Sequence, residues 1–349
     1  MPHCKPLRRQ AGSALPVNLA LKHRIMTKAT QKKLKKYIEK AATSNVAKST
    51  RRFFFNHLNE SMESRGHFHV DQMYGSGSGV LLKFNDKYFV LTAKHVIDNN
   101  IKGELQNESP FWFPVKNKAG WSSLYDFLFP KRVWNIGELI SEKVISIDSS
   151  DICLVELFHP QKFHMPDHCI EINDKSSVLT KEEFFDGQFL LVTGYPFERN
   201  SFDFSPQSED ITHTTNIQRH TIPGVYLTNE SGSYISFEMT EGDTLHKNVN
   251  GMSGGAVYNV QPKANQVKLA GVPVTAGNNV CRFIPSYIFI DAVINYRDSS
   301  ATIIDPIVNN PPALEDVMKV SLEYLKQFDP QFKSDIKEGF NKAMHRASR

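Results

Sequence analysis

Three segments of the chain carry side chains that together can perform nucleophilic catalysis. Ser253 lies in the glycine-rich run Asn-Gly-Met-Ser-Gly-Gly-Ala-Val, His95 follows an apolar run, and Asp151 directly precedes another one. A serine hydroxyl is a poor nucleophile until a base takes its proton. A neutral imidazole can act as that base, and a carboxylate can hold the imidazole in the correct tautomer. We therefore predict His95, Asp151 and Ser253 as a catalytic triad.

The glycines around Ser253 fit the second requirement of acyl transfer, which is a site for the developing oxyanion. Backbone N–H groups aimed at that oxygen stabilise it. Gly251 permits the unusual backbone angles that turn such donors inward. We expect the N–H groups of Gly251 and Ser253 to form the oxyanion hole. Asp148 competes with Asp151 for the acid position, and we favour Asp151 because an apolar strand starts directly after it.

Short apolar runs separated by turn residues must position these side chains. Such runs without alternating helices favour antiparallel barrels or a sandwich over a parallel sheet. An Asn85-Asp86 turn joins the first two runs, 80–84 and 88–92, into a hairpin. The other predicted strands are 144–147, 152–157, 189–192, 234–239, 256–260, 268–274 and 287–290.

Five regions follow from this pattern. We predict a disordered basic tail over 1–25, an N-terminal helical segment over 26–68 and a first β-barrel over 69–165. A second β-barrel over 166–305 and C-terminal helices over 306–349 complete the chain.

Four motifs, taken together, resemble those of a known family. Gly-Ser-Gly-Val, Leu-Thr-Ala-Lys-His-Val, Asp-Ile-Cys-Leu-Val and Gly-Met-Ser-Gly-Gly-Ala-Val occur in the order His, Asp, Ser, with spacings of 56 and 102 residues. The set resembles trypsin-like serine peptidases of the chymotrypsin fold, in particular bacterial intracellular or high-temperature-requirement-like members. The resemblance covers about residues 70–300. Lys94, where alanine is more usual, and Met252, where secreted zymogens often carry an aspartate, depart from the pattern.

The resemblance implies an all-β core of two antiparallel, six-stranded-type β-barrels with the site in the cleft between them and helices added at both ends. It implies a serine endopeptidase that hydrolyses peptide bonds through an acyl-enzyme intermediate and needs no metal or other cofactor. The strand carrying Val274, Thr275 and Ala276 would pair with an extended protein or peptide substrate. Lys247 resembles the residue at the base of the primary pocket, which would favour acidic side chains.

Three other interpretations of the sequence are open. A nucleophile elbow of the α/β-hydrolase type needs a histidine after the serine, and only His345 follows Ser253. A metal site is suggested by His67 and His69 and by the cluster His164, Asp167, His168 and Cys169, but Pro166 breaks any helix that would align the cluster. The third is a protease-fold scaffold that binds a peptide or regulatory partner with little turnover.

Charge and cysteine usage limit which binding partners and which cellular location we expect. The net charge is +4, yet residues 1–55 hold 14 lysines and arginines and one acid, Glu39. This basic arm is a candidate contact for an acidic partner or nucleic acid. If the arm has a tethering or regulatory role, deleting 1–55 should change localisation or partner binding more than hydrolysis of a small ester. Four scattered cysteines and the lack of an apolar leader or membrane span predict a cytoplasmic protein.

Overall fold

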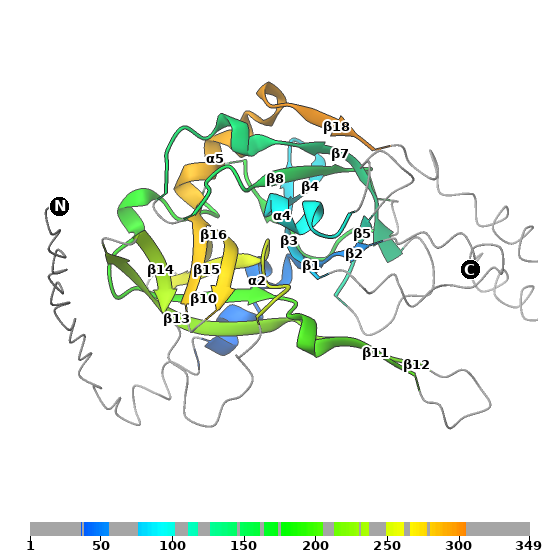
Figure 1. Ribbon diagram of the computed structural model, residues 1–349, viewed down its shortest axis with the longest axis horizontal. Helices are drawn as coiled ribbons and strands as arrows, with labels where there is room; N and C mark the ends of the chain where they lie inside the picture. Colours follow the sequence, from blue (N-terminus) through cyan, green and yellow to red (C-terminus); the bar gives the residue numbers. More distant parts are fainter. Residues whose placement is uncertain are drawn as a thin grey trace, which may run out of the picture.

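The computed structural model describes residues 36, 38–55, 76–101, 111–117, 126–144, 147–160, 164–173, 176–204, 213–229, 232–236, 249–261, 266–277 and 280–304. In this part of the chain the protein is mostly β, with antiparallel sheets and few helices, as predicted. Figure 1 shows two strand-rich halves side by side. The predicted tail over 1–25, the C-terminal helices over 306–349 and Lys247 lie outside the described residues.

The first half is a seven-stranded sheet with strand order β1-β3-β4-β8-β7-β18, in which the short β9 pairs with β3. All neighbours along this path are antiparallel, and β9 alone is parallel to its partner. Its strands are β1 (Thr50–Arg52), β3 (Ser78–Phe84), β4 (Lys87–Thr92), β7 (Pro130–Trp134), β8 (Cys153–Leu157), β9 (Ile170–Glu171) and β18 (Ala301–Ile303).

The predicted hairpin joins β3 to β4. Asn85 and Asp86 both have positive φ, 49° and 57°, and Phe84 pairs with Lys87 across the turn. Two-residue turns of this kind match the twist of the strands they connect. The hairpin is therefore confirmed, and it fixes the register that brings the end of β4 beside the start of β3.

The second half is a closed barrel with strand order β10-β13-β14-β17-β16-β15. The strands are β10 (Phe189–Gly194), β13 (His220–Asn229), β14 (Gly232–Ser236), β15 (Ala256–Gln261), β16 (Gln266–Gly277) and β17 (Val280–Pro285). Two antiparallel, six-stranded-type β-barrels were expected; among the described residues the first half is a seven-stranded sheet whose path has β1 and β18 at its ends.

Smaller elements surround the two halves. A hairpin, β11 (Asn200–Phe204) and β12 (His213–Ile217), projects from the body in Figure 1. A three-stranded sheet consists of β2 (Phe54–Phe55), β5 (Phe111–Pro114) and β6 (Phe127–Leu128). The helices are α2 (Asn45–Lys48), α4 (Lys94–Asp98), α5 (Ser286–Ile294) and the 3₁₀ turns η3 (Ile136–Leu139), η4 (Lys181–Glu183), η5 (Phe197–Arg199) and η7 (Tyr296–Asp298).

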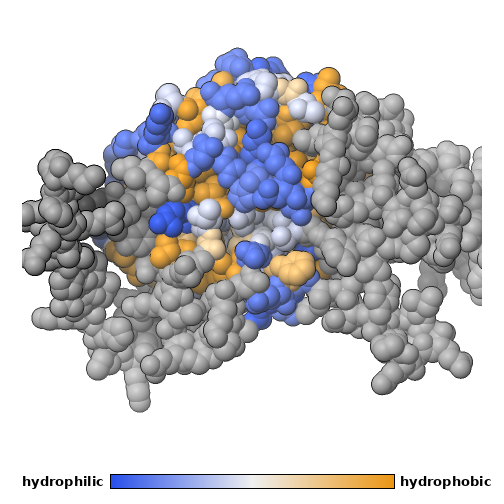
Figure 2. Space-filling view, in the orientation of Figure 1, coloured by the Kyte–Doolittle hydropathy of each residue, from blue (hydrophilic) through white to orange (hydrophobic). Residues whose placement is uncertain are grey.

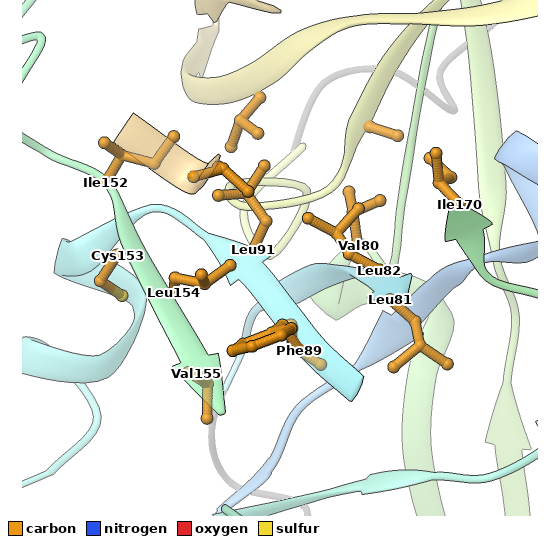
Figure 3. Close-up of a cluster of buried hydrophobic side chains, with 14 of the residues drawn as sticks. Val80, Leu81, Leu82, Phe89, Leu91, Ile152, Cys153, Leu154, Val155 and Ile170 are labelled. Atoms are coloured by element: carbon orange, nitrogen blue, oxygen red, sulfur yellow. The ribbon is translucent and has the colours of Figure 1, made fainter. Parts of the chain in front are cut away.

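The core follows from strand periodicity. On β10, Leu190 and Val192 pack in a cluster of barrel residues, whereas Leu191 between them packs in the cluster that includes the first sheet. Successive side chains on a strand point to opposite faces. The barrel therefore fills its interior with one face and covers the first half with the other. Figure 3 shows the part of this core contributed by β3, β4, β8 and β9.

The basic arm does not end where the sequence suggested. Arg51 and Arg52 belong to β1 and are 0% and 1% exposed. Arg51 donates to the carbonyls of Pro114, Val115 and His168, so its guanidinium is hydrogen-bonded although it is buried. The predicted helical segment 26–68 is thus wrong over residues 50–55, which form β1 and β2 and pair with the body.

Two other expectations need correction. The apolar run 287–290, predicted as a strand, lies in α5, whose N-cap is Pro285. A short apolar run fits a buried helix as well as a strand. Strands β9 and β18 lie in the range predicted for the second barrel, 166–305, yet both pair in the first sheet.

One face of the molecule is seen in Figure 2. Hydrophilic side chains form a band down the centre of the described surface, with apolar side chains on both sides of it. Among the described helices, none is long and apolar enough to cross a membrane.

Candidate active site

His95 and Asp151 come together because two neighbouring strands end and begin at the same edge. Strands β4 and β8 are antiparallel, with Thr92 opposite Cys153. His95 lies in the first turn of α4, just after β4, and Asp151 lies just before β8. Their side chains are 31% and 21% exposed, so the pair lies at the surface of the sheet edge and is open to a substrate.

Both oxygens of the Asp151 carboxylate contact His95. Oδ2 lies 2.6 Å from the ring nitrogen Nδ1, and Oδ1 accepts the backbone N–H of His95 at 2.8 Å. A carboxylate at Nδ1 favours the tautomer with the proton on that nitrogen. Nε2 is then the nitrogen that can accept a proton from a nucleophile.

Asp148, the other candidate acid, points elsewhere. Its Oδ1 accepts the backbone N–H of Ser150 at 2.9 Å and the Ser150 hydroxyl at 2.6 Å. These hydrogen bonds lower the pKa of Asp148. Its carbonyl also accepts the N–H of Asp151 at 3.1 Å. Asp148 therefore shapes the turn that presents Asp151, and Asp151 is the acid beside His95.

The loop that carries Ser253 lies against the strand end that carries His95. A Cβ placed on Gly254 would lie 2.1 Å from Thr92 Oγ1 and 3.2 Å from the Ala93 nitrogen. The carbonyl of Ser253 accepts the N–H of Ser78, in β3, at 3.0 Å. Residues far apart in the sequence, one in each half, therefore share one junction, and only a glycine fits at position 254.

The Ser253 hydroxyl makes a different contact from the expected one. Oγ donates to the carbonyl of Val274 at 3.1 Å. Within the described residues this is its hydrogen-bond partner, so the Ser253–His95 hydrogen bond of a complete triad is not formed. The structure thus joins His95 to Asp151 directly and leaves Ser253 on the adjacent loop with its hydroxyl on Val274.

The peptide groups around Ser253 are held by hydrogen bonds. The carbonyl of Asn250 accepts the N–H of Phe197 at 2.7 Å, and that of Met252 accepts the N–H of Gly255 at 3.0 Å. The N–H groups of Met252 and Gly254 donate to Val249 and Pro273, at 3.1 and 2.8 Å. The loop therefore has a defined backbone path.

Two backbone N–H groups in the Ser253 loop are not used by these hydrogen bonds. In the described part of the chain, the N–H groups of Gly251 and Ser253 have no acceptor. Gly251 has φ +94° and is buried, a conformation that side chains other than glycine's rarely adopt. Buried N–H groups are nearly always paired, so two unpaired donors in one glycine turn are available to donate hydrogen bonds to an oxyanion.

The predicted substrate residues lie on β16, at an irregular point. Pairing with β17 shifts register between Pro273 and Thr275, so Val274 falls at a bulge. Val274 is buried, Thr275 is exposed and Ala276 is partly buried. Because Val274 is not paired with a residue of β17, its carbonyl can accept the Ser253 hydroxyl. The predicted substrate strand therefore lies next to the predicted nucleophile.

The residues proposed as metal ligands form ordinary polar contacts. His168 Nδ1 lies 3.2 Å from Asn45 Oδ1, and His168 Nε2 lies 3.7 Å from an oxygen of Asp167. Over the described ranges, no group of three or more His, Cys, Asp or Glu is placed to hold a metal ion. His67 and His69 lie outside those ranges.

Ser78 was not predicted as a functional residue, although it lies in the Gly-Ser-Gly-Val motif. The buried Ser78 hydroxyl lies between the Gly251 carbonyl and the Tyr195 N–H. A serine between two glycines at the start of a buried strand was the available signal.

Comparisons with known proteins add nothing to this geometry. No protein-family model matches the chain, and no curated protein matches it.

Proposed function

We propose that the protein is a serine endopeptidase with His95 as general base, Asp151 as the acid that orients it and Ser253 as nucleophile. The observation that carries the proposal is the 2.6 Å contact between His95 Nδ1 and Asp151 Oδ2, next to a glycine turn that offers two unpaired N–H groups. A carboxylate, an imidazole and a serine turn in one junction are the parts that acyl transfer requires.

The reaction begins with rotation of the Ser253 hydroxyl from the Val274 carbonyl to His95 Nε2. Oγ then attacks the peptide carbonyl while Nε2 takes its proton, and the Gly251 and Ser253 N–H groups hold the oxyanion. His95 gives the proton to the leaving amine, which departs and leaves an acyl-enzyme. Water, deprotonated by His95, hydrolyses the ester and restores the serine.

The fold proposed with this function is chymotrypsin-like, with the curled first sheet and the closed barrel as its two lobes. The antiparallel sheets and the position of the candidate site between the two halves support that assignment. Val274, Thr275 and Ala276 would pair with the substrate backbone. The proposed substrate is a protein or peptide.

A second function is favoured by one contact. Because the Ser253 hydroxyl donates to Val274, the structure also suits a protease-fold scaffold that binds a peptide or regulates a partner with little turnover. The two functions differ in whether the hydroxyl can reach His95 when a substrate is present.

A fluorophosphonate probe separates them, because it reacts with a serine hydroxyl only where a base activates it. We expect the full-length protein to be labelled, Ser253→Ala to remain unlabelled and Ser76→Ala to be labelled as the wild type. Ser76 is the matched control, because it lies near the loop and its hydroxyl has no partner among the described residues.

Peptide-library cleavage by the wild type beside Ser253→Ala completes the test. Labelling together with cleavage supports the endopeptidase. A wild-type protein that neither takes the probe nor cleaves any peptide would overturn the proposal in favour of the scaffold.

A further inference from the structure

We propose that Ser78 is a positioning residue for the oxyanion hole: its hydroxyl holds the peptide between Gly251 and Met252, which joins the two peptides that carry the Gly251 and Ser253 N–H groups and so sets the direction of one relative to the other. This inference rests on the proposed peptidase function. Ser78 belongs to β3 in the first sheet, whereas the oxyanion turn belongs to the second half.

All four polar functions of Ser78 are used. The hydroxyl donates to the Gly251 carbonyl at 2.7 Å and accepts the Tyr195 N–H at 2.9 Å. The backbone N–H donates to the Ser253 carbonyl at 3.0 Å, and the backbone carbonyl accepts the Thr92 hydroxyl at 2.8 Å. Ser78 and Thr92 are both 0% exposed, so water does not compete for these groups.

These contacts fix the stretch of backbone that joins the Gly251 and Ser253 N–H groups. A peptide group is planar and trans, so fixing its carbonyl fixes its N–H on the opposite side. The carbonyl before Gly251, that of Asn250, is held by Phe197, and the carbonyl after it is held by Ser78. With both flanking peptides held, the backbone angles of Gly251 are set.

The side-chain hydroxyl is the component of this arrangement that a substitution can remove alone. Ser78→Ala keeps both backbone hydrogen bonds of residue 78 but leaves the Gly251 carbonyl without its donor. Glycine has wide conformational freedom, so the peptide after Gly251 can then rotate. The N–H groups of Gly251 and Ser253 would then no longer keep a fixed orientation relative to each other. The loss falls on the transition state, because only there does the substrate oxygen carry the charge.

The test measures kcat and KM of the full-length protein on a peptide that the wild type cleaves. Removing one oxyanion donor outright costs about 10²- to 10³-fold in kcat. We expect Ser78→Ala to lower kcat by about tenfold or more, with KM changed less than about twofold. Affinity for a peptide boronate should fall in parallel with kcat, while affinity for the cleaved product should not.

Ser76→Ala is the matched control. It makes the same chemical change two residues earlier, where no hydroxyl contact to the described residues is lost, and kcat should stay within about twofold of wild type. If Ser78→Ala does not fold, Ser78→Cys fills nearly the same space with a weak donor, and kcat should still fall about fivefold.

Three results would overturn the inference: wild-type kcat in the folded Ser78→Ala or Ser78→Cys protein, a change confined to KM, or an equal loss in Ser76→Ala. Ser253→Ala in the same assay keeps this outcome separate from the function. If Ser253→Ala is inactive while Ser78→Ala has wild-type kcat, only the role of Ser78 fails. If Ser253→Ala cleaves at the wild-type rate, the peptidase proposal itself fails.

Discussion

The two oxygens of Asp151 hold one histidine from two directions, through its ring and through its backbone. Asparagine at this position would present an amide N–H₂ to Nδ1 and so favour the wrong tautomer. We expect Asp151→Asn to lower kcat/KM by about 10³- to 10⁴-fold without unfolding the protein. Steady-state kinetics on a cleaved peptide, with circular dichroism to verify the fold, measures this.

Asp148→Asn is the control for that experiment. Asp148 has the same chemistry three residues earlier, but its Oδ1 accepts only from Ser150, and asparagine keeps an acceptor there. Its kcat/KM should stay within about threefold of wild type. If Asp148→Asn had the larger effect, the assignment of the acid would be reversed.

At the scale of elements, the junction between β4 and the Ser253 loop depends on Gly254. Gly254 and Gly187 have similar positive φ, +78° and +81°, but only Gly254 is crowded, since a Cβ on Gly187 meets nothing within 4 Å. We expect Gly187→Ala to cost about 1 kcal/mol of unfolding free energy from backbone strain alone. Gly254→Ala should cost about 3 kcal/mol or more and abolish activity.

Urea unfolding of the two alanine variants measures the difference. Both carry the same left-handed strain, so the excess loss in Gly254→Ala reports the contact with Thr92 and the Ser78 carbonyl. Equal losses would mean that this junction is loosely packed, and the proposed alignment of His95 with Ser253 would lose its structural basis.

Elements with a strong local signal were predictable from the sequence, and those defined by distant pairing were not. The Asn85-Asp86 turn and the apolar runs of β3, β4 and β8 carry their own pattern, so the positions of His95 and Asp151 followed from them. Strands β9 and β18 are two and three residues long and exist because they pair with β3 and β7. No periodicity can be detected over such lengths.

Side-chain partners were less predictable than elements. The hydroxyl of Ser253 was expected on His95 and lies on Val274, because the acceptor depends on a bulge 21 residues later in the chain. Arg51 and Arg52 resembled the rest of a solvated basic arm. The burial of Arg51 depends on carbonyl groups supplied by β5 and by the segment around His168, which no local composition reveals.

At the scale of the whole molecule, residues 41–55 belong to the folded body. Ala41, Ala47 and Phe53 are buried, and Phe53 packs against Phe55, Phe111 and Phe113. We expect deletion of 1–55 to abolish cooperative unfolding and ester hydrolysis together, because it removes β1 and this aromatic cluster. The hypothesis that the whole of 1–55 is a removable tether is therefore not retained.

Neutralising the arm is the control for that deletion. Replacing Lys32, Lys33, Lys35 and Lys36 by glutamine removes charge and leaves β1 in place. The midpoint temperature of thermal unfolding should then match that of the wild type. The rate of hydrolysis of a small ester should stay within about twofold of the wild-type rate. If the variant lacking residues 1–55 unfolds cooperatively and hydrolyses the ester, residues 1–55 are not needed for the folded body.

The edges of the first sheet have a consequence for biosynthesis. Its two outermost strands are β1 and β18, which are about 250 residues apart in the chain. A nascent polypeptide cannot complete this sheet until Ile303 has left the ribosome, well after Ser253 has emerged. The first sheet would therefore gain its last strand only after every residue of the candidate site has emerged.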